Sequence, residues 1–410
     1  MNYTMDKVMK RIEMIIFAVL PCIVILSFTG LYFVLDERQS SDSQELTAFS
    51  APTLSGYLSG SFQEQFEQAL KDQFALHDQA IGLTAAVKAK LGTAYNSVHN
   101  LLRAIPSTDG LMPYGNVFRM YSTDWLTNMP YTYQSETVHN TLRKADEINA
   151  FSKRHASARF YVYYCTRAED LDWFDQTEGV TSYPYAQLLQ NRLDANIRFD
   201  QLKFRDFAEY SQMIYKTDHH WNHRGAAGGY ADILRMMSQD YSLGSARSIL
   251  HTEDFNNLLW NGSRSRESGV DIPLSGLDLF CVNHYLLGEH KTWFGDDERT
   301  IGLQADYAKG EVNRELEFDQ YLNYYGFESK VIRLEFDASE HNLLIIGDSF
   351  ARAIREPLAS HFGTTVYVNF RILSSVDLDE LMEQYSIDTV LLIGQQDAWS
   401  GYFLSGGEAE

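Results

Sequence analysis

Residues 342–349, NLLIIGDS, decide the fold of the C-terminal part of this chain. The apolar run Asn342–Ile346 is predicted to be a buried strand, and it leads directly into the turn Gly347-Asp348-Ser349. Two more apolar runs follow, Thr364–Phe370 (TTVYVNF) and Thr389–Ile393 (TVLLI). Continuous apolar strands that alternate with helices indicate a parallel sheet covered on both faces. We therefore predict an α/β fold with a mainly parallel sheet.

Other segments extend this pattern toward the N-terminus. The spacing of apolar residues predicts helices over Phe350–His361, Asp377–Tyr385, Arg224–Met237 and Ser61–Ala80. The aromatic run Arg159–Cys165 (RFYVYYC) predicts a further strand. Residues 240–330 carry mixed signals, and no topology is predicted for them.

A membrane anchor is predicted near the N-terminus. Met14–Leu35 contains 22 residues without a charge, enough to cross ~30 Å of hydrocarbon at ~1.5 Å per residue. Lys7, Lys10 and Arg11 precede it, so the N-terminus is expected to stay in the cytoplasm. A cleaved signal peptide is the alternative, but the stretch exceeds the usual ~7–15 residues and no A-x-A site follows. The predicted division is a cytoplasmic tail 1–11, an anchor 12–35, a tether 36–50 and an extracytoplasmic domain 51–410 with N-terminal helices.

Composition excludes some classes of protein. The chain has 34 Lys and Arg against 55 Asp and Glu, a net charge of −21, and no long basic run, so a nucleic-acid binder is not expected. Three cysteines are too few for a disulfide scaffold. Cys165 and Cys281 could pair, or both could remain free buried thiols.

The turn Gly347-Asp348-Ser349 is the first candidate for chemistry. Catalytic groups of parallel sheets lie at the C-terminal ends of strands, where Ser349 falls. A serine at a strand-to-helix turn exposes its hydroxyl beside the free N–H groups of the next helix, which suits a nucleophile whose attack creates an oxyanion. The same position also favours a serine that only caps the helix.

The second candidate is Thr217–His223, TDHHWNH. In an extended segment Asp218 and His220 point to the same side, and an Asp that orients an imidazole is what a general base needs. His220 would then take the proton of Ser349, while His219 would face the other way in a structural role. Histidines that only pack and hydrogen-bond are the alternative, and Trp221 could belong to the core or form a wall of the site.

A metal site is the other possible use of these histidines. If a helix begins here, His219 and His223, or His220 and His223, could hold Zn²⁺ from one face. No H-E-x-x-H motif and no evident third ligand accompany them. We therefore predict neither a metal nor another cofactor.

Both candidate segments resemble family signatures. TDHHW resembles the signature of the DHHW family of bacterial membrane-anchored proteins, and GDSF resembles the nucleophile block of SGNH hydrolases. The order, with Asp-x-His before the Ser, is similar to the alginate-acetylation type of SGNH-like proteins. The resemblance implies an α/β/α sandwich in which Ser349 is the nucleophile, His220 the base and Asp218 the orienting acid.

The resemblance also implies a function. SGNH-like proteins of this type perform O-acyl ester chemistry, often acetyl transfer, on an extracytoplasmic polysaccharide, with a membrane-bound O-acyltransferase as partner. SGNH hydrolases use a Gly and an Asn as further oxyanion donors. The candidates here are Asn323 and the Gly326 backbone, with Trp221 as a substrate contact, although residues 321–326 (YLNYYG) also fit a packed aromatic strand.

Three hypotheses follow. The first is a membrane-anchored serine O-acyltransferase or esterase, most simply an O-acetyl one, acting on a cell-envelope polysaccharide. The second is a catalytically inactive glycan-binding or scaffold protein of the same system, and the third is a metal-dependent hydrolase. The first predicts activity that rises as His220 loses its proton, at pH ~6–7 for an ordinary imidazole.

Overall fold

The computed structural model describes residues 111–114, 117–120, 125–128, 131–171, 182–268, 276–295, 297–298, 312–316, 318–326, 331–336, 338–402 and 404. All of them belong to Ala85–Glu410, the second of the two compact units of the chain. The predicted anchor, its tether and the helix over Ser61–Ala80 lie outside the described residues. No helix within the described ranges has the length and apolar character needed to cross a bilayer.

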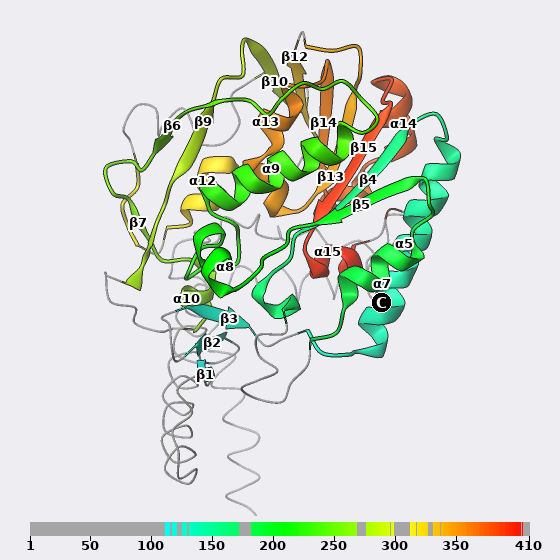
Figure 1. Ribbon diagram of the computed structural model, residues 1–410. Coiled ribbons are helices and arrows are strands. Elements are labelled where there is room, and N and C mark those ends of the chain that lie inside the picture. Colours follow the sequence, from blue (N-terminus) through cyan, green and yellow to red (C-terminus); the bar gives the residue numbers. More distant parts are fainter. Residues whose placement is uncertain are drawn as a thin grey trace, which may run out of the picture. The chain divides into compact units, whose positions relative to one another are not determined.

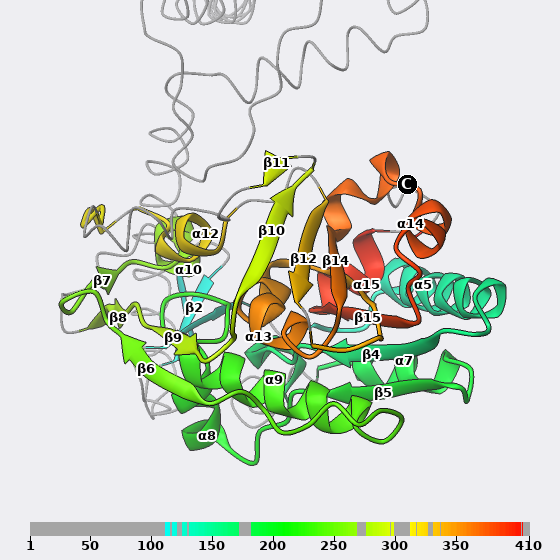
Figure 2. The same cartoon turned by 90° about the horizontal axis from the view of Figure 1, so that it is seen from above.

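An eight-stranded sheet in the order β11-β10-β12-β14-β13-β15-β4-β5 forms the centre of this unit (Figures 1 and 2). Five strands run parallel: β14 (Thr364–Asn369), β13 (Leu343–Gly347), β15 (Thr389–Gly394), β4 (Arg159–Tyr164) and β5 (Ile197–Gln201). Antiparallel strands extend one edge: β12 (Ile332–Phe336), β10 (His290–Phe294) and β11 (Asp297–Glu298). The predicted mainly parallel α/β fold is confirmed, and the four strands predicted from sequence each lie within one residue of their observed ends.

Helices cover both faces of the sheet. Side chains alternate along β4, so that Tyr161 and Tyr163 join one hydrophobic cluster while Phe160 and Val162 join another. The first face packs against α8 (Phe207–Met213), α9 (His223–Met237) and α13 (Arg355–Ala359). The second packs against α5 (Ser135–Arg154), α7 (Tyr185–Arg192), α14 (Leu378–Gln384) and α15 (Gln396–Gly401). The residues thus form the three layers of an α/β/α arrangement.

A third apolar cluster lies outside the eight-stranded sheet. It is built by Tyr215, Phe255, Leu258, Trp260, Phe280, Val282, Tyr321 and Tyr324. It receives side chains from β7 (Leu259–Trp260), β9 (Val282–Tyr285) and α12 (Gln320–Tyr325). The same stretch of the chain also contains β6 (Ile249–Glu253), α10 (Ser263–Ser268) and β8 (Asp278–Leu279). Strands β6 and β9 pair antiparallel, as do β7 and β8. Three more strands, β1 (Leu111–Tyr114), β2 (Val117–Met120) and β3 (Leu126–Asn128), form a separate antiparallel sheet.

Helix α9 forms although its sequence contains three glycines near its start. A Cβ at Gly225 would lie 2.1 Å from the carbonyl oxygen of Met213, and one at Gly229 would lie 2.3 Å from the ring of Trp221. Trp221 is fully buried against these positions. Gly225 therefore allows the close approach of Met213, and Gly229 makes room for the indole, although both residues weaken the helical signal of the sequence.

Two predicted elements differ from the observed ones. The predicted helix Phe350–His361 is divided into the 3₁₀ segment η4 (Ser349–Ala353) and α13. Pro357 would clash with the carbonyl of Ala353 in one continuous helix, whereas it is tolerated in the first turn of a new one. The alternative of an aromatic strand at residues 321–326 is wrong, because the side chain of Asp319 caps helix α12 there. Cys165 and Cys281 are both buried and free.

Candidate active site

Ser349 lies at the carboxyl end of β13, at the start of η4. Asp348 links this end to that of β15, because its carboxylate accepts hydrogen bonds from the N–H groups of Phe350 (2.9 Å) and Gln395 (2.9 Å). A Cβ at Gly347 would lie 2.6 Å from that of Ala351, so the sharp turn requires glycine. Among the described residues, no group accepts a hydrogen bond from the Ser349 N–H. The turn therefore presents a hydroxyl and an N–H at one place.

His220 joins Ser349 to Asp218. Its Nε2 lies 2.6 Å from Ser349 Oγ, and its Nδ1 lies 2.6 Å from Asp218 Oδ1. The backbone N–H of His220 also donates to Asp218 Oδ1 at 2.9 Å. The structure thus brings together the three side chains predicted as nucleophile, base and orienting acid, although Ser349 is separated from His220 by well over a hundred positions in the sequence.

Asp218 is fully buried and remains charged. Its Oδ2 accepts the N–H of Ser263 at 2.8 Å, so both carboxylate oxygens are hydrogen-bonded. Burial would raise the pKa of Asp218, but the charges that His220 and His219 can carry and the hydrogen bonds from His220 and Ser263 hold that pKa well below its ordinary value. The carboxylate can therefore orient His220 and stabilise an imidazolium across the neutral range.

A second, half-buried carboxylate fixes the backbone just before Asp218. Asp278 accepts hydrogen bonds from the N–H of Lys216 (2.7 Å), the N–H of Thr217 (2.7 Å) and the hydroxyl of Thr217 (2.6 Å). Burial raises the pKa of Asp278 to about 6, even though these hydrogen bonds act in the opposite direction. A Cβ at Gly262 would lie 2.5 Å from the Cβ of Asp218, so the neighbouring chain also packs closely on the segment.

The ring of Tyr321 packs against the ring of His220. The two rings are stacked, with centroids 4.0 Å apart and planes 13° from parallel. The Tyr321 hydroxyl donates to the carbonyl oxygen of Ser349 at 3.1 Å. A single side chain from α12 therefore restrains both the imidazole and the turn that carries the hydroxyl. This role of Tyr321 is not predicted from the sequence, where residues 321–326 suggest only the candidates Asn323 and Gly326 or an aromatic strand.

The prediction that His219 faces away from His220 is wrong. The centroids of the two imidazoles lie 3.9 Å apart, and His219 Nδ1 lies 3.0 Å from Ser263 Oγ. Burial and the neighbouring charge of His220 lower the pKa of His219 well below its ordinary value, and Arg167 and Arg264 contribute to that shift. His219 lies beside the site because residues 216–220 form a series of bends rather than a strand.

The groups that could bind a metal are arranged differently from the two histidine pairs considered in the sequence. His223 begins α9 and is not part of the cluster. Instead Asp218, His219 and His220 offer ligand atoms that all lie within 4.8 Å of one another.

The other predicted site residues are engaged elsewhere. Asn323 donates to the carbonyl of Asp319 at 2.8 Å, and the Gly326 N–H donates to the carbonyl of Leu322 at 2.8 Å, so both serve the ends of α12. Trp221 packs edge-on against Phe350 at 5.4 Å and belongs to the core. No described hydrogen bond joins Asn323, Gly326 or Trp221 to Ser349.

Gln395, which was not among the residues predicted from the sequence, lies beside the turn that carries Ser349, since its backbone N–H donates to Asp348. It follows β15 directly, at the same edge of the sheet as Ser349, and it is partly exposed. The guanidinium of Arg167, which follows β4, donates to Gln395 Oε1 and to the hydroxyl of Tyr131. No described group accepts a hydrogen bond from Gln395 Nε2, which leaves these N–H groups to donate to a ligand. The position of Gln395 directly after a predicted strand is the one feature of the sequence that could have pointed to it.

A buried ion network lies beneath the site. Glu169 is fully buried, and its Oε1 accepts hydrogen bonds from Arg167 (2.9 Å) and Arg264 (2.5 Å). Arg264 also donates to the carbonyl of Asp218 at 3.3 Å. Burial would raise the pKa of Glu169, but the two guanidinium groups lower it below the ordinary value. The network therefore connects the end of β4 to the segment that carries the base.

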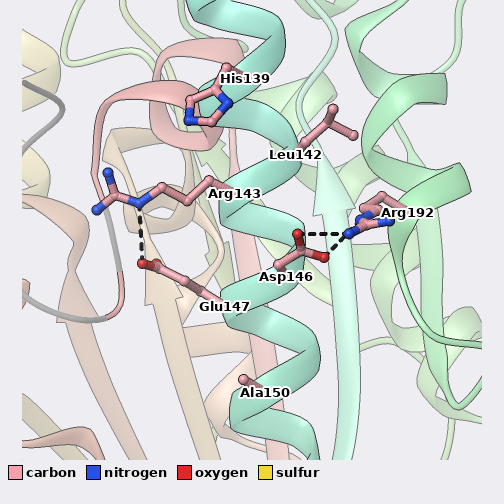
Figure 3. Close-up of a pocket in the computed structure, with 7 residues that line it drawn as sticks. All are labelled: His139, Leu142, Arg143, Asp146, Glu147, Ala150 and Arg192. Carbon is pink, nitrogen blue, oxygen red and sulfur yellow. Dashed lines mark hydrogen bonds and ion pairs between the residues drawn. The ribbon is translucent and has the colours of Figure 1, made fainter.

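A surface pocket on α5 and α7 is separate from these residues. His139, Leu142, Arg143, Asp146, Glu147, Ala150 and Arg192 line it (Figure 3). Its charges are largely paired with one another, since Arg192 contacts Asp146 at 2.7 Å and Arg143 contacts Glu147 at 3.7 Å. None of the candidate catalytic residues lies in this pocket.

Comparison with known proteins shows structural relatives only. No family model matches the chain. No curated protein matches its sequence. PatB1 of Bacillus cereus is similar in structure, with a TM-score of 0.55 and 21% identity over 68% of this chain and 95% of that one. A structure of PatB1 with a sulfonyl adduct gives a TM-score of 0.56 at 19% identity over 70% of this chain and 99% of that one.

Two further solved structures match this chain. A DHHW family protein from Eubacterium siraeum has a TM-score of 0.52 and 16% identity over 73% of this chain and 95% of that one. The O-acetyltransferase domain of Pseudomonas putida AlgJ matches with a TM-score of 0.40 and 9% identity over 69% of this chain and 92% of that one. The similarity to PatB1 and to the DHHW family protein shows that this chain shares their fold.

Proposed function

We propose that this chain is a membrane-anchored, extracytoplasmic serine O-acyltransferase or esterase that acts on a cell-envelope polysaccharide. The observation that carries the proposal is the hydrogen-bonded series Asp218–His220–Ser349 at the carboxyl end of a parallel strand. A nucleophile, a base in contact with it and an acid that orients the base are the three parts that covalent acyl transfer needs.

The proposed reaction is a double displacement. His220 Nε2 takes the proton of Ser349 as Oγ attacks the acyl carbon of an ester, and Asp218 stabilises the resulting imidazolium. The imidazolium then gives its proton to the departing alkoxide, which leaves an acyl group on Oγ. A sugar hydroxyl or water, deprotonated by His220, attacks this acyl-enzyme and frees Ser349. Acetyl is the proposed acyl group, on the resemblance to the alginate-acetylation type.

The tetrahedral oxyanion needs donors at the same edge of the sheet. The N–H of Ser349 and the Nε2 of Gln395 are the proposed donors, because Arg167 holds the carbonyl end of the Gln395 amide. Gln395→Ala is expected to lower kcat about 10²–10³-fold, since this donor acts on charge that develops in the transition state. KM should change little. Steady-state kinetics on a small aryl acetate would measure both constants.

Two further variants sharpen this test. Gln395→Glu keeps the size of the side chain but removes its N–H groups, so it should lose as much kcat as the alanine variant. Gln384→Ala changes an exposed glutamine on α14 and should retain wild-type kinetics. Wild-type kcat in Gln395→Ala would remove this residue from the proposed mechanism.

Covalent labelling tests the proposed nucleophile directly. A sulfonyl fluoride suits the purpose, because such reagents react with activated serine hydroxyls and PatB1, which is similar in fold, is known with a sulfonyl adduct. We expect one adduct per chain, located on Ser349 by peptide mass spectrometry, and no adduct in His220→Ala. An adduct on another serine, or equal labelling of His220→Ala, would contradict the mechanism and favour a binding or scaffold protein.

The proposed location rests on the apolar stretch 14–35 and on the basic residues that precede it. A membrane-bound O-acyltransferase that supplies acyl groups from across the bilayer is the proposed partner. Protease added to intact cells from which any outer barrier has been removed should degrade the domain that carries Ser349, and a tag at the N-terminus should be protected. Protection of the domain would reverse the proposed orientation.

A further inference from the structure

We propose that Asp218, His219 and His220 form a Zn²⁺-binding site, and that an ion bound there inhibits the serine chemistry. The metal site stands on the geometry of the three side chains alone, whereas the inhibition rests on the proposed function.

The ligand atoms of these residues already converge. Asp218 Oδ1 lies 2.6 Å from His220 Nδ1 and 3.9 Å from His219 Nδ1. The three side chains form the one group of three His, Cys, Asp or Glu side chains with such spacing in the described parts of the chain. Two imidazoles and one carboxylate make a ligand set that suits Zn²⁺, with a fourth position left open.

Small movements would complete the coordination. Tetrahedral Zn²⁺ with bonds of ~2.0–2.1 Å separates its ligand atoms by about 3.3 Å. The Asp218–His220 contact would lengthen and the Asp218–His219 contact would shorten, each by less than ~1 Å. The Ser263 hydroxyl lies 3.0 Å from His219 Nδ1 and would have to give up this contact if that nitrogen bound the ion. Solvent reaches the cluster through His219, whose side chain is 24% exposed.

Binding would lock the base in the wrong tautomer. For His220 to accept the Ser349 proton at Nε2, its own proton must sit on Nδ1, facing Asp218. Zn²⁺ on Nδ1 displaces that proton, which moves to Nε2 in the neutral imidazole. Nε2 would then donate to Ser349 Oγ instead of accepting from it. The ion would therefore inhibit without contacting Ser349.

Direct binding tests the site independently of activity. The full chain, stripped with a chelator, is titrated with Zn²⁺ by calorimetry, and the retained metal is counted by mass spectrometry. We expect one Zn²⁺ per chain in the wild type and in Ser349→Ala, which keeps every ligand. His219→Ala and His219→Gln should each weaken binding at least about 10-fold. Two substitutions, each checked for an unchanged Tm, separate a lost ligand from a lost fold.

A histidine elsewhere serves as the control. His139 lines the same α5 pocket as Asp146 and Glu147 (Figure 3), so His139→Ala removes a surface imidazole from a pocket that also holds carboxylates. It should leave the affinity unchanged. No bound Zn²⁺ in the wild type, unchanged affinity in both His219 variants, or an equal loss in His139→Ala would each overturn the metal site.

Labelling tests the inhibition. The rate of sulfonyl fluoride labelling of the wild type should fall at least about 10-fold at saturating Zn²⁺ and recover with EDTA. In the His219 variants, the same Zn²⁺ concentration should not slow the labelling. Unchanged labelling of the Zn²⁺-loaded wild type would overturn the inhibition. If Ser349 does not label even without metal, the proposed function fails, while the titration still decides the metal site.

Discussion

Replacing Ser349 with alanine is expected to lower kcat for ester cleavage by about 10⁴–10⁶-fold, the range found when one member of a cooperating triad is removed. His220→Ala should fall in the same range, because the hydroxyl is a weak nucleophile without its base. The double variant should lose little more than either single one, since the two residues act as a unit. Steady-state and single-turnover kinetics on an aryl acetate would measure these losses.

The pH profile and a matched serine complete this test. Asp218 has a pKa held well below its ordinary value, so its titration lies outside the neutral range. The wild-type kcat/KM should fall in acid, because the base must be neutral to accept the proton of Ser349. Ser375→Ala, which alters an exposed serine in η5 (Phe370–Ser375), should match the wild type. A flat profile from pH 5 to 8, or activity retained by Ser349→Ala, would exclude the proposed mechanism.

Glu169→Ala is expected to lower the free energy of unfolding by about 3–5 kcal/mol, because it leaves Arg167 and Arg264 buried without their shared carboxylate. Chemical denaturation followed by fluorescence would measure the change. The exposed pair formed by Asp146 and Arg192 offers the matched control. Asp146→Ala should cost no more than about 1 kcal/mol, since surface ion pairs contribute little. Equal effects of the two substitutions would show that burial of the network is not what makes it stabilising.

Acid should reproduce part of the Glu169 effect. The pKa of Glu169 is lower in the folded state than its ordinary value, so the unfolded chain takes up the proton first as the pH falls. The stabilising contribution of this carboxylate is therefore complete above its unfolded pKa, ~4.3, and is lost as the pH falls through the folded value. The difference in Tm between wild type and Glu169→Ala should narrow below pH ~4.

The sheet could be predicted because its central strands are buried on both faces. Leu343–Gly347 and Thr389–Gly394 contain only buried side chains, and such strands appear in the sequence as unbroken apolar runs. Asp218 and His220 could be paired from their spacing, and the place of Ser349 followed from the strand before it. These inferences depend on local patterns, which the sequence records directly.

Other parts of the site depend on contacts between distant segments. Tyr321 reaches His220 from α12, and Arg167 reaches Gln395 across two strand ends, so no spacing in the sequence records either contact. His219 was placed on the wrong side because an extended segment was assumed, whereas Asp278 anchors the backbone in a series of bends. Pro357 was a readable signal for the break after η4.

The proposed enzyme can lose its activity while the sheet stays folded, because part of its site is held by the elements around the third cluster. Ser263, Asp278 and Tyr321 position Asp218 and His220, and all three come from segments outside the eight strands. Sub-global opening of these segments would free the base and remove the Tyr321 contact to the Ser349 turn, while β13 itself stays folded. Amide hydrogen exchange should therefore be faster in β7 and β8 than in β13. During refolding, activity should return only after the segments that carry Ser263, Asp278 and Tyr321 have packed.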